Sequence, residues 1–244
     1  GYSAVKTMGK GGEGINVNGA VTISSGELDV LVTGSKYVYS PVMSSTPKGI
    51  NSDLIMMING GKIKVRVNNS SSGEGLESKV AVLVNGGLIE VSAVDDCIKG
   101  EKYVDIYNAS IYAYSAEGDG IDSNGEVNIL NSSVVAVGGK SNNGIECMDG
   151  KFMVDASEVV AIGESNTVMD SEENYFVSYT SPVIGGECLS IVDEKGTDML
   201  GYKLPKSYDS VSLLITARKM KKQNSYKVKK VTSLEGNNFH GMYF

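Results

Sequence analysis

Carboxylates recur at fixed distances from a repeated apolar residue, and this spacing could assemble a cation site. Six short motifs place an acidic or polar residue two positions before an apolar anchor and another one position after it. If the motifs stack, carboxylates gather on one corner and repel one another unless a cation or a proton intervenes. Oxygen ligands without His or Cys suit a hard ion, and Ca²⁺ tolerates irregular oxygen shells better than Mg²⁺. The predicted calcium ligands are Glu74, Glu77, Asp95, Asp96, Asp119, Asp122 and Glu146.

Two alternatives to this calcium site stay open. Asp and Asn beside Gly also cap tight turns without any metal. Lys99 interrupts the acidic row and could itself neutralise part of its charge. In addition, Lys99 or Lys102, beside Asp95 and Asp96, could serve as the base of a polysaccharide lyase, with calcium acidifying the proton next to a uronate carboxylate.

Four tyrosines of one repeat provide a second kind of chemistry. Tyrosine rings can stack on sugar rings while their hydroxyl groups form hydrogen bonds. These rings occupy outward positions on two successive strands, where they form a carbohydrate-binding platform or simply decorate the surface. The predicted platform comprises Tyr103, Tyr107, Tyr112 and Tyr114. A neighbouring outward face carries Lys62, Lys64 and Arg66, which would meet either an acidic sugar chain or water.

The elements that position these side chains form a repeat of roughly 23 residues. The apolar anchors stand at positions 15, 50, 76, 98, 121 and 145, and two apolar pairs follow each anchor. The spacing of two within each pair is the period of a β-strand. Three strands in so short a repeat exclude a propeller, and a leucine-rich repeat would show its Leu/Asn consensus. The sequence therefore predicts an all-β fold, with a right-handed parallel β-helix of about six to seven coils in residues 1–165.

Residues 166–244 depart from the repeat. Longer alternating strands are predicted at 175–179, 188–192, 210–217 and 226–231. A solenoid must cover the open edge of its last coil, because free strand edges recruit other chains. We therefore expect residues 166–244 to form a C-terminal β-rich cap packed on the last coil.

The charge and hydropathy of the chain exclude two classes of interaction, with nucleic acid and across a membrane. The net charge is −7, and residues 1–202 carry 13 basic and 27 acidic side chains. Nucleic acid is not an expected partner, because an acidic surface repels phosphates. There is no apolar run of 18 residues, so we expect no transmembrane segment. There is also no apolar segment near the start, and we expect that a signal peptide or lipoprotein anchor has been removed.

Several phrases of the sequence are similar to those of a known family. They are residues 59–65 (NGGKIKV), 92–98 (SAVDDCI) and 117–125 (EGDGIDSNG), together with the stretch from 205–209 (PKSYD) to 226–228 (YKV). The chain thereby resembles bacterial secreted carbohydrate-binding β-helix proteins, which are related in shape to polysaccharide lyases. Their best-studied type is a clostridial surface protein that binds cellulose and acidic plant polysaccharide. The resemblance implies Ca²⁺ between coils and polysaccharide binding without established catalysis, although Lys48 and Cys97 depart from the family pattern.

Together these observations predict a secreted or cell-surface protein that binds polysaccharide, from plant cell walls or another acidic glycan, with Ca²⁺ between its coils. We expect a monomer. One alternative is a lyase that acts on uronate-containing glycans through Lys99 or Lys102. The other is a structural adhesin or spacer, whose outward Ile55, Met57 and Leu83 would contact a protein partner.

Overall fold

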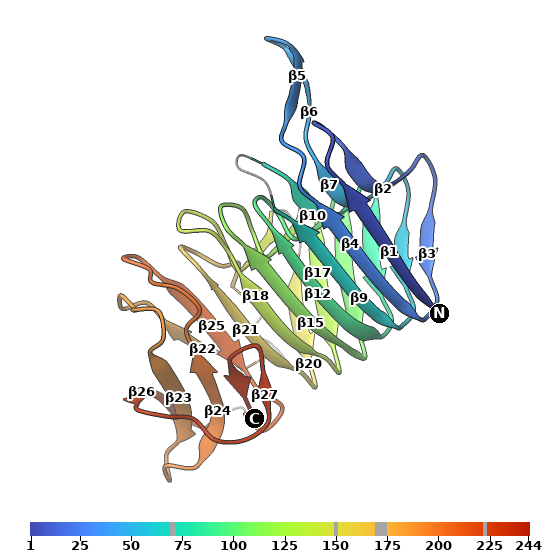
Figure 1. Ribbon diagram of the computed structural model, residues 1–244. Helices are drawn as coiled ribbons and strands as arrows, with labels where there is room; N and C mark the ends of the chain where they lie inside the picture. The colour runs from blue at the N-terminus through green and yellow to red at the C-terminus, as the bar shows by residue number, and fades with distance from the viewer. Residues whose placement is uncertain (69–71, 149–150, 169–174, 222–223) are drawn as a thin grey trace.

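The computed structural model describes residues 1–68, 72–148, 151–168, 175–221 and 224–244. Within these residues the chain forms β-strands and no helix. Six successive coils of three strands each stack into a parallel β-solenoid (Figure 1). The predicted fold class, a parallel β-helix with further β-strands after the coils, is confirmed.

Each coil contributes one strand to each of three sheets. Sheet A contains the long strand of every coil and is flanked by one N-terminal and two C-terminal strands. Its strands, in spatial order, are β1 (Tyr2–Thr7), β4 (Glu27–Val32), β9 (Lys62–Val67), β12 (Gly87–Ala93), β15 (Ala109–Ser115), β18 (Ser133–Val137), β21 (Glu158–Gly163), β25 (Ser212–Thr216) and β22 (Val177–Tyr179).

Sheets B and C are formed by the shorter strands. Sheet B carries the apolar anchors and consists of β2 (Glu13–Val17), β7 (Lys48–Ser52), β10 (Glu74–Ser78), β13 (Ile98–Gly100), β16 (Ile121–Ser123) and β19 (Ile145–Cys147). Sheet C consists of β3 (Val21–Ile23), β8 (Met56–Ile58), β11 (Ala81–Val84), β14 (Tyr103–Tyr107), β17 (Glu126–Leu130) and β20 (Phe152–Asp155).

The register of these sheets follows the apolar anchors. Ile98 pairs with Leu76 on one side and with Ile121 on the other, and all three side chains are fully buried. Because each coil repeats the same inward positions, Ile, Val and Leu side chains stack along the axis and form one continuous core. Burying one such side chain contributes about 1.5–3 kcal/mol, so the stack is the main stabilising feature of the solenoid.

The corner between sheets C and A requires glycine in the second and third coils. Gly87 has a φ of +105°, which disfavours side chains, and a Cβ there would lie 2.7 Å from the carbonyl oxygen of Gly61 in the preceding coil. Beside this corner, the amide of Asn85 donates to the side-chain oxygen of Asn59 at 2.8 Å. The corner thus depends on small residues and on an asparagine ladder that links adjacent coils.

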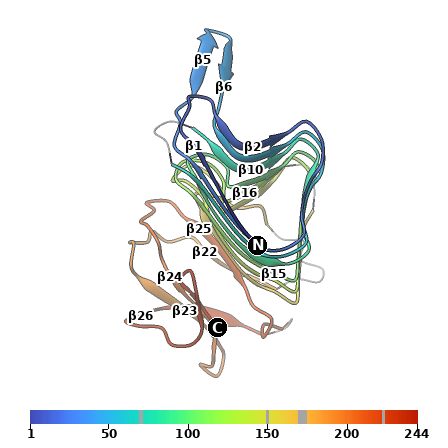
Figure 2. The same cartoon turned by 45° about the vertical axis from the view of Figure 1, so that its right-hand side comes forward.

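One insertion interrupts the coils. A hairpin of β5 (Tyr37–Ser40) and β6 (Met43–Ser45) lies between the first and second coils and projects from the solenoid (Figure 2). The Ser45 hydroxyl at its base donates to the carbonyl oxygen of Gly11 at 3.1 Å. The insertion accounts for the long step of 35 residues between the first two anchors.

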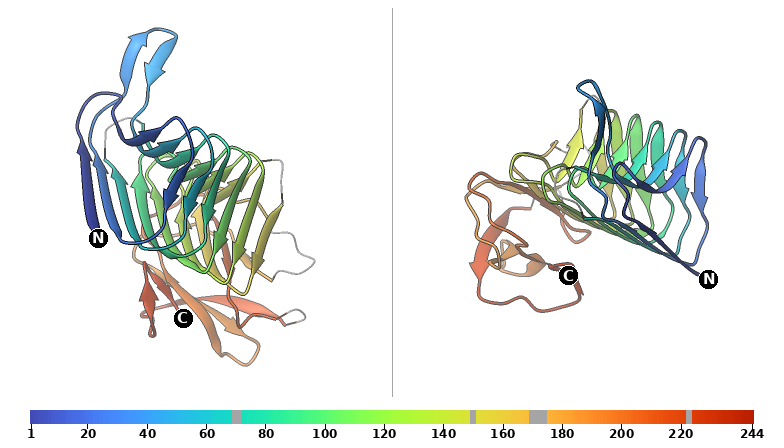
Figure 3. Two further views of the ribbon diagram at one scale, coloured as in Figure 1. Left: turned by 90° about the vertical axis from the view of Figure 1, so that its right-hand side faces the viewer. Right: turned by 45° about the horizontal axis from the view of Figure 1, so that its top comes forward.

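The C-terminal strands both extend sheet A and cover its outer face. β25 pairs antiparallel with β21, the last strand of the coils, and β22 pairs with β25. A separate sheet contains β26 (Tyr226–Val231), β23 (Cys188–Asp193), β24 (Asp198–Lys203), β28 (Met242–Tyr243) and β27 (Asn238–Phe239). This C-terminal sheet lies against the outer face of sheet A, as the two views of Figure 3 show. The division at residue 165 stays a prediction.

A second apolar core joins the two parts. Val135 and Val137 of β18 and Ile162 of β21 point outward from the coils and pack against the C-terminal strands. Tyr208 is buried at this contact, and its hydroxyl donates to the carbonyl oxygen of Gly138 at 2.7 Å. The outer face of sheet A is therefore an internal contact over its last coils.

Candidate functional site

The predicted acidic row is formed by sheet B. The pairing places Glu77 beside Lys99, Lys99 beside Asp122, and Asp122 beside Glu146, one residue from each coil. A second row runs along the corner between sheets A and B, with Glu74 next to Lys48 and with Asp96 and Asp119 in the following coils. The repeat therefore stacks these side chains in two adjacent rows, and their role as calcium ligands stays a prediction.

Two lysines neutralise part of the row. The ammonium group of Lys48 forms ion pairs with both Glu74 and Glu77. The ammonium group of Lys99 lies 2.8 Å from Asp96 Oδ2 and 2.6 Å from Asp122 Oδ2, thereby linking two coils. Glu74 and Glu77 are thus held by a cation that the protein itself supplies.

Three of the seven predicted ligands form a compact cluster. One oxygen of each of Asp96, Asp119 and Asp122 lies within 4.8 Å of the other two, and all three residues are buried. Asp122 is only 4% exposed, and its Oδ1 atom has no hydrogen-bond partner among the described residues. Asp96 Oδ1 accepts a hydrogen bond from the Asp119 amide at 2.9 Å. With Lys99, this cluster carries three carboxyl groups and one ammonium group.

Burial changes the acidity of the cluster. Loss of hydration raises the pKa of Asp119, and the neighbouring Asp96 and Glu146 carboxyl groups raise it further. Burial also raises the pKa of Asp122, although Lys99 opposes this change. The pKa of Asp95 is raised by burial and by Asp96. Carboxyl groups in this state need a proton or another cation, and oxygen donors around the unpartnered Asp122 oxygen fit a hard divalent ion.

The same geometry bears on the proposed lyase base. The two ion pairs of Lys99 raise the pKa of its ammonium group despite partial burial of the side chain. A lysine held in the protonated form cannot accept a proton from a sugar. Lys102 has an exposed side chain at the start of β14, and it is not part of the carboxylate cluster.

The four predicted tyrosines divide into two pairs on different faces. Tyr112 and Tyr114 lie on β15 in sheet A, under the C-terminal segment. The His240 ring stacks on Tyr112 with 3.9 Å between ring centroids and 7° between planes. The Lys206 ammonium group lies 4.9 Å from the centre of the Tyr114 ring. Burial raises the pKa of Tyr112 to about 12, consistent with a ring packed inside a contact.

Tyr103 and Tyr107 stand on β14 in sheet C, whereas the C-terminal strands pack on sheet A. Both side chains are partly exposed. They lie on the same face as Asp105, and the Asn128 amide from the next coil donates to Asp105 Oδ1 at 2.8 Å. Burial and the Asp105 carboxylate raise the pKa of the Tyr107 hydroxyl, so this hydroxyl remains a hydrogen-bond donor at neutral pH.

Apolar side chains extend this face to either side. Leu83 of the preceding coil pairs with Asp105, and Leu130 of the next coil pairs with Tyr107. Leu130 is 40% exposed and Met153 of the last coil is 45% exposed. The outer face of sheet C therefore combines rings, apolar groups and hydrogen-bonding groups on a flat surface. Polysaccharide-binding surfaces combine such groups.

The basic face of the second coil is paired with carboxylates. Lys62 lies 3.6 Å from Glu27, Lys64 lies 4.0 Å from Glu90, and Arg66 donates to both oxygens of Asp29 at 2.7 and 2.9 Å. Since each cation has its own partner, this face offers little unpaired positive charge to an acidic sugar.

Sequence reasoning assigned no role to His240, which joins the C-terminal segment to the coils. Its Nε2 atom lies 2.8 Å from Glu90 Oε1. No local motif marks this contact, because the two residues are 150 positions apart. The sequences of β18 and β21 could nevertheless have shown that the outer face of sheet A is covered, because their unbroken apolar runs indicate burial on both faces.

Comparison with known proteins bears on the region that carries sheet C. Residues 66–181 match a family model described as a carbohydrate-binding domain-containing protein. The match spans Tyr103, Tyr107 and the Asp96, Asp119 and Asp122 cluster, and it supports polysaccharide binding. Neither the curated proteins nor the solved structures include a match to this chain. Within the described residues, no helix is long and apolar enough to cross a membrane.

Proposed function

We propose that this protein binds polysaccharide through the outer face of sheet C. The observation that carries the proposal is the different environment of the two tyrosine pairs. All four rings are partly exposed and lie within the span of the carbohydrate-binding match, but Tyr112 and Tyr114 contact His240 and Lys206 of the C-terminal segment, whereas Tyr103 and Tyr107 make no such ring contact among the described residues. Successive strand residues rise about 3.3 Å, so the backbone positions of Tyr103 and Tyr107 are about 13 Å apart and their rings can contact different units of an extended glycan.

The polar groups of this face supply orientation. Asp105 lies between the two rings and can accept hydrogen bonds from sugar hydroxyl groups, while Asn128 holds its carboxylate in place. Tyr hydroxyl groups add donors at both ends. We include no catalytic step, because the pKa of Lys99 is raised by its two carboxylate partners.

Calcium is part of the proposal. Asp96, Asp119 and Asp122 would hold the ion and thereby link the turn before β13 to the turn before β16 and to β16 itself. Bound there, Ca²⁺ would neutralise carboxylates that burial otherwise protonates. We also propose an extracellular or cell-surface location, where polysaccharide is available and where calcium sites of modest affinity are occupied.

The test is depletion of the purified protein onto insoluble cellulose and onto gel-trapped pectate, each with calcium and with EDTA. Tyr103→Ala and Tyr107→Ala should each weaken retention about fivefold, because a stacking contact contributes ~1 kcal/mol. Tyr2→Ala is the matched control, since Tyr2 is exposed on β1, which flanks the first coil, whereas Tyr103 and Tyr107 belong to the fourth coil. Retention that is unchanged in both sheet C variants, or absent on every glycan, would contradict the proposal.

A further inference from the structure

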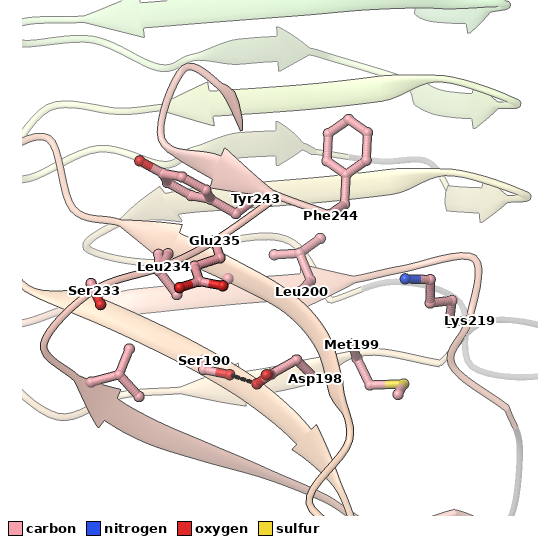
Figure 4. A pocket seen from close by; sticks show the side chains of 12 residues that line it. Ser190, Asp198, Met199, Leu200, Lys219, Ser233, Leu234, Glu235, Tyr243 and Phe244 are labelled. Carbon is pink, nitrogen blue, oxygen red and sulfur yellow. Dashed lines mark hydrogen bonds between the residues drawn. The ribbon is translucent and has the colours of Figure 1, made fainter. Parts of the chain in front are cut away.

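A cavity of about 370 Å³ lies on the face of the C-terminal sheet, outside residues 66–181 (Figure 4). Cavities of this size lie within the range of small-molecule sites. Its lining includes residues of β23, β24 and β28 and of the segment 231–235. None of these residues belongs to the acidic cluster or to sheet C.

The cavity lies on the face that three paired residues share. Ser190 of β23 pairs directly with Gly201 of β24, and Gly201 pairs with Tyr243 of β28. Directly opposed residues on antiparallel strands share a face. The Leu234 side chain occupies the space above Gly201, because a Cβ on Gly201 would lie 2.5 Å from it. The depression that forms the cavity therefore lies on this face beside Leu234, which is one of its lining residues.

Polar groups surround this depression. The Ser190 hydroxyl donates to Asp198 Oδ1 at 2.5 Å, which leaves the second oxygen of Asp198 able to accept another hydrogen bond. Figure 4 shows Glu235 on one side of the cavity and Lys219 on the other, with Leu200 between them. In the described part of the chain, neither Glu235 nor Lys219 forms an ion pair.

The charge balance selects the ligand chemistry. Two carboxylates and one ammonium group give the cavity a net negative charge, which disfavours an anionic ligand. An apolar floor beside an aromatic ring, with acceptors and one donor around it, matches a ring that carries several hydroxyl groups. We infer that this cavity binds one neutral sugar residue, with Asp198 and Glu235 accepting its hydroxyl protons and Tyr243 contacting its ring.

The inference rests on the proposed function for its ligand class but uses a separate site. The C-terminal cavity is lined by strands of the C-terminal sheet and by none of sheet C. A protein with both sites would hold a polysaccharide at two points, and the second contact would then form at a high effective concentration.

The experiment is ligand-observed NMR with the full chain and monosaccharides. The probes are glucose, galactose and mannose, each compared with its uronic acid. At least one neutral hexose should bind better than its uronic acid, because the net negative charge of the cavity disfavours an anionic ligand. Asp198→Asn should weaken that binding about tenfold, because it removes a charged acceptor. Asp209→Asn, an exposed substitution outside the cavity, is the matched control.

Each outcome decides between the two sites. Tyr107→Ala should leave monosaccharide binding unchanged while it weakens retention on polysaccharide. Asp198→Asn should weaken monosaccharide binding, and it should also reduce retention on polysaccharide because the second contact is lost. If no neutral hexose binds, if its uronic acid binds better, or if Asp198→Asn has no effect, the inference is wrong. The sheet C proposal would still stand on the depletion assay.

Discussion

Replacing Lys99 tests how the acidic corner is neutralised. Lys99→Met keeps most of the methylene packing and removes the ammonium group that contacts Asp96 and Asp122 at 2.8 and 2.6 Å. The Lys99 side chain is 22% exposed and the two carboxylates are 10% and 6% exposed, so water screens these contacts only partly. We expect the free energy of unfolding to fall by about 3 kcal/mol at neutral pH, the lower end of the range for breaking a buried ion pair.

The loss should depend on pH and on calcium. At lower pH the unpaired carboxyl groups take up protons in the folded state, so the penalty of the substitution should shrink. Calcium should stabilise Lys99→Met more than the parent protein, because the ion then replaces the missing positive charge beside Asp96, Asp119 and Asp122.

Urea unfolding with EDTA and with calcium measures both effects. Lys79→Met is the matched control: its ammonium group lies 2.6 Å from Asp53, but the side chain is exposed, and we expect no comparable change. If Lys99→Met unfolds like the control in EDTA, Lys99 does not neutralise the corner. If calcium stabilises the variant and the parent equally, the ion binds elsewhere.

Three further predictions concern pH and backbone geometry. Burial raises the pKa of Asp119 to about 8, so between about pH 4 and pH 8 the folded state retains a proton that the unfolded state has lost. The free energy of unfolding in EDTA should therefore fall as the pH rises from about 4 to about 8. Asp119→Asn should flatten this profile in thermal unfolding. Burial lowers the pKa of Lys206 to about 8, so between about pH 8 and pH 10.5 the unfolded state binds more protons than the folded state. The free energy of unfolding should therefore increase over this pH range. The increase should vanish in Lys206→Met. Gly87→Ala should lower the free energy of unfolding by about 1–3 kcal/mol, because it places a side chain at positive φ against the backbone of Gly61. Gly60→Ala, where the nearest atom is 3.5 Å away, should cost clearly less in the same urea titration.

The fold could be predicted because every coil of a solenoid carries the same pattern of apolar and small residues. The pair Val82 and Val84 is spaced by two, points inward and is fully buried. The same register brings Lys99 beside Asp122. Both results depend on contacts between residues one repeat apart, and such contacts are visible as periodicity in the sequence.

The environment of the tyrosines could not be predicted in the same way. Tyr112 and Tyr107 occupy similar outward positions, yet only Tyr112 is covered, by His240 from the far end of the chain. This contact is not part of any repeat, so periodicity carries no information about it. The C-terminal cavity is likewise formed by strands that pair antiparallel and share no register with the coils.

The distribution of lysines along the acidic row indicates where the proposed calcium ion would bind. Lys48 forms ion pairs with both carboxylates of the third coil, Glu74 and Glu77. Lys99 forms ion pairs with Asp96 and Asp122. Beyond Lys99, the fifth and sixth coils add Asp119 and Glu146 without another lysine in the row. Since burial raises the pKa of Asp119, this carboxyl group retains a proton unless a cation replaces it. The proposed calcium ion would take the place of that proton beside the unpartnered oxygen of Asp122, as the lysines do for the carboxylates of the earlier coils.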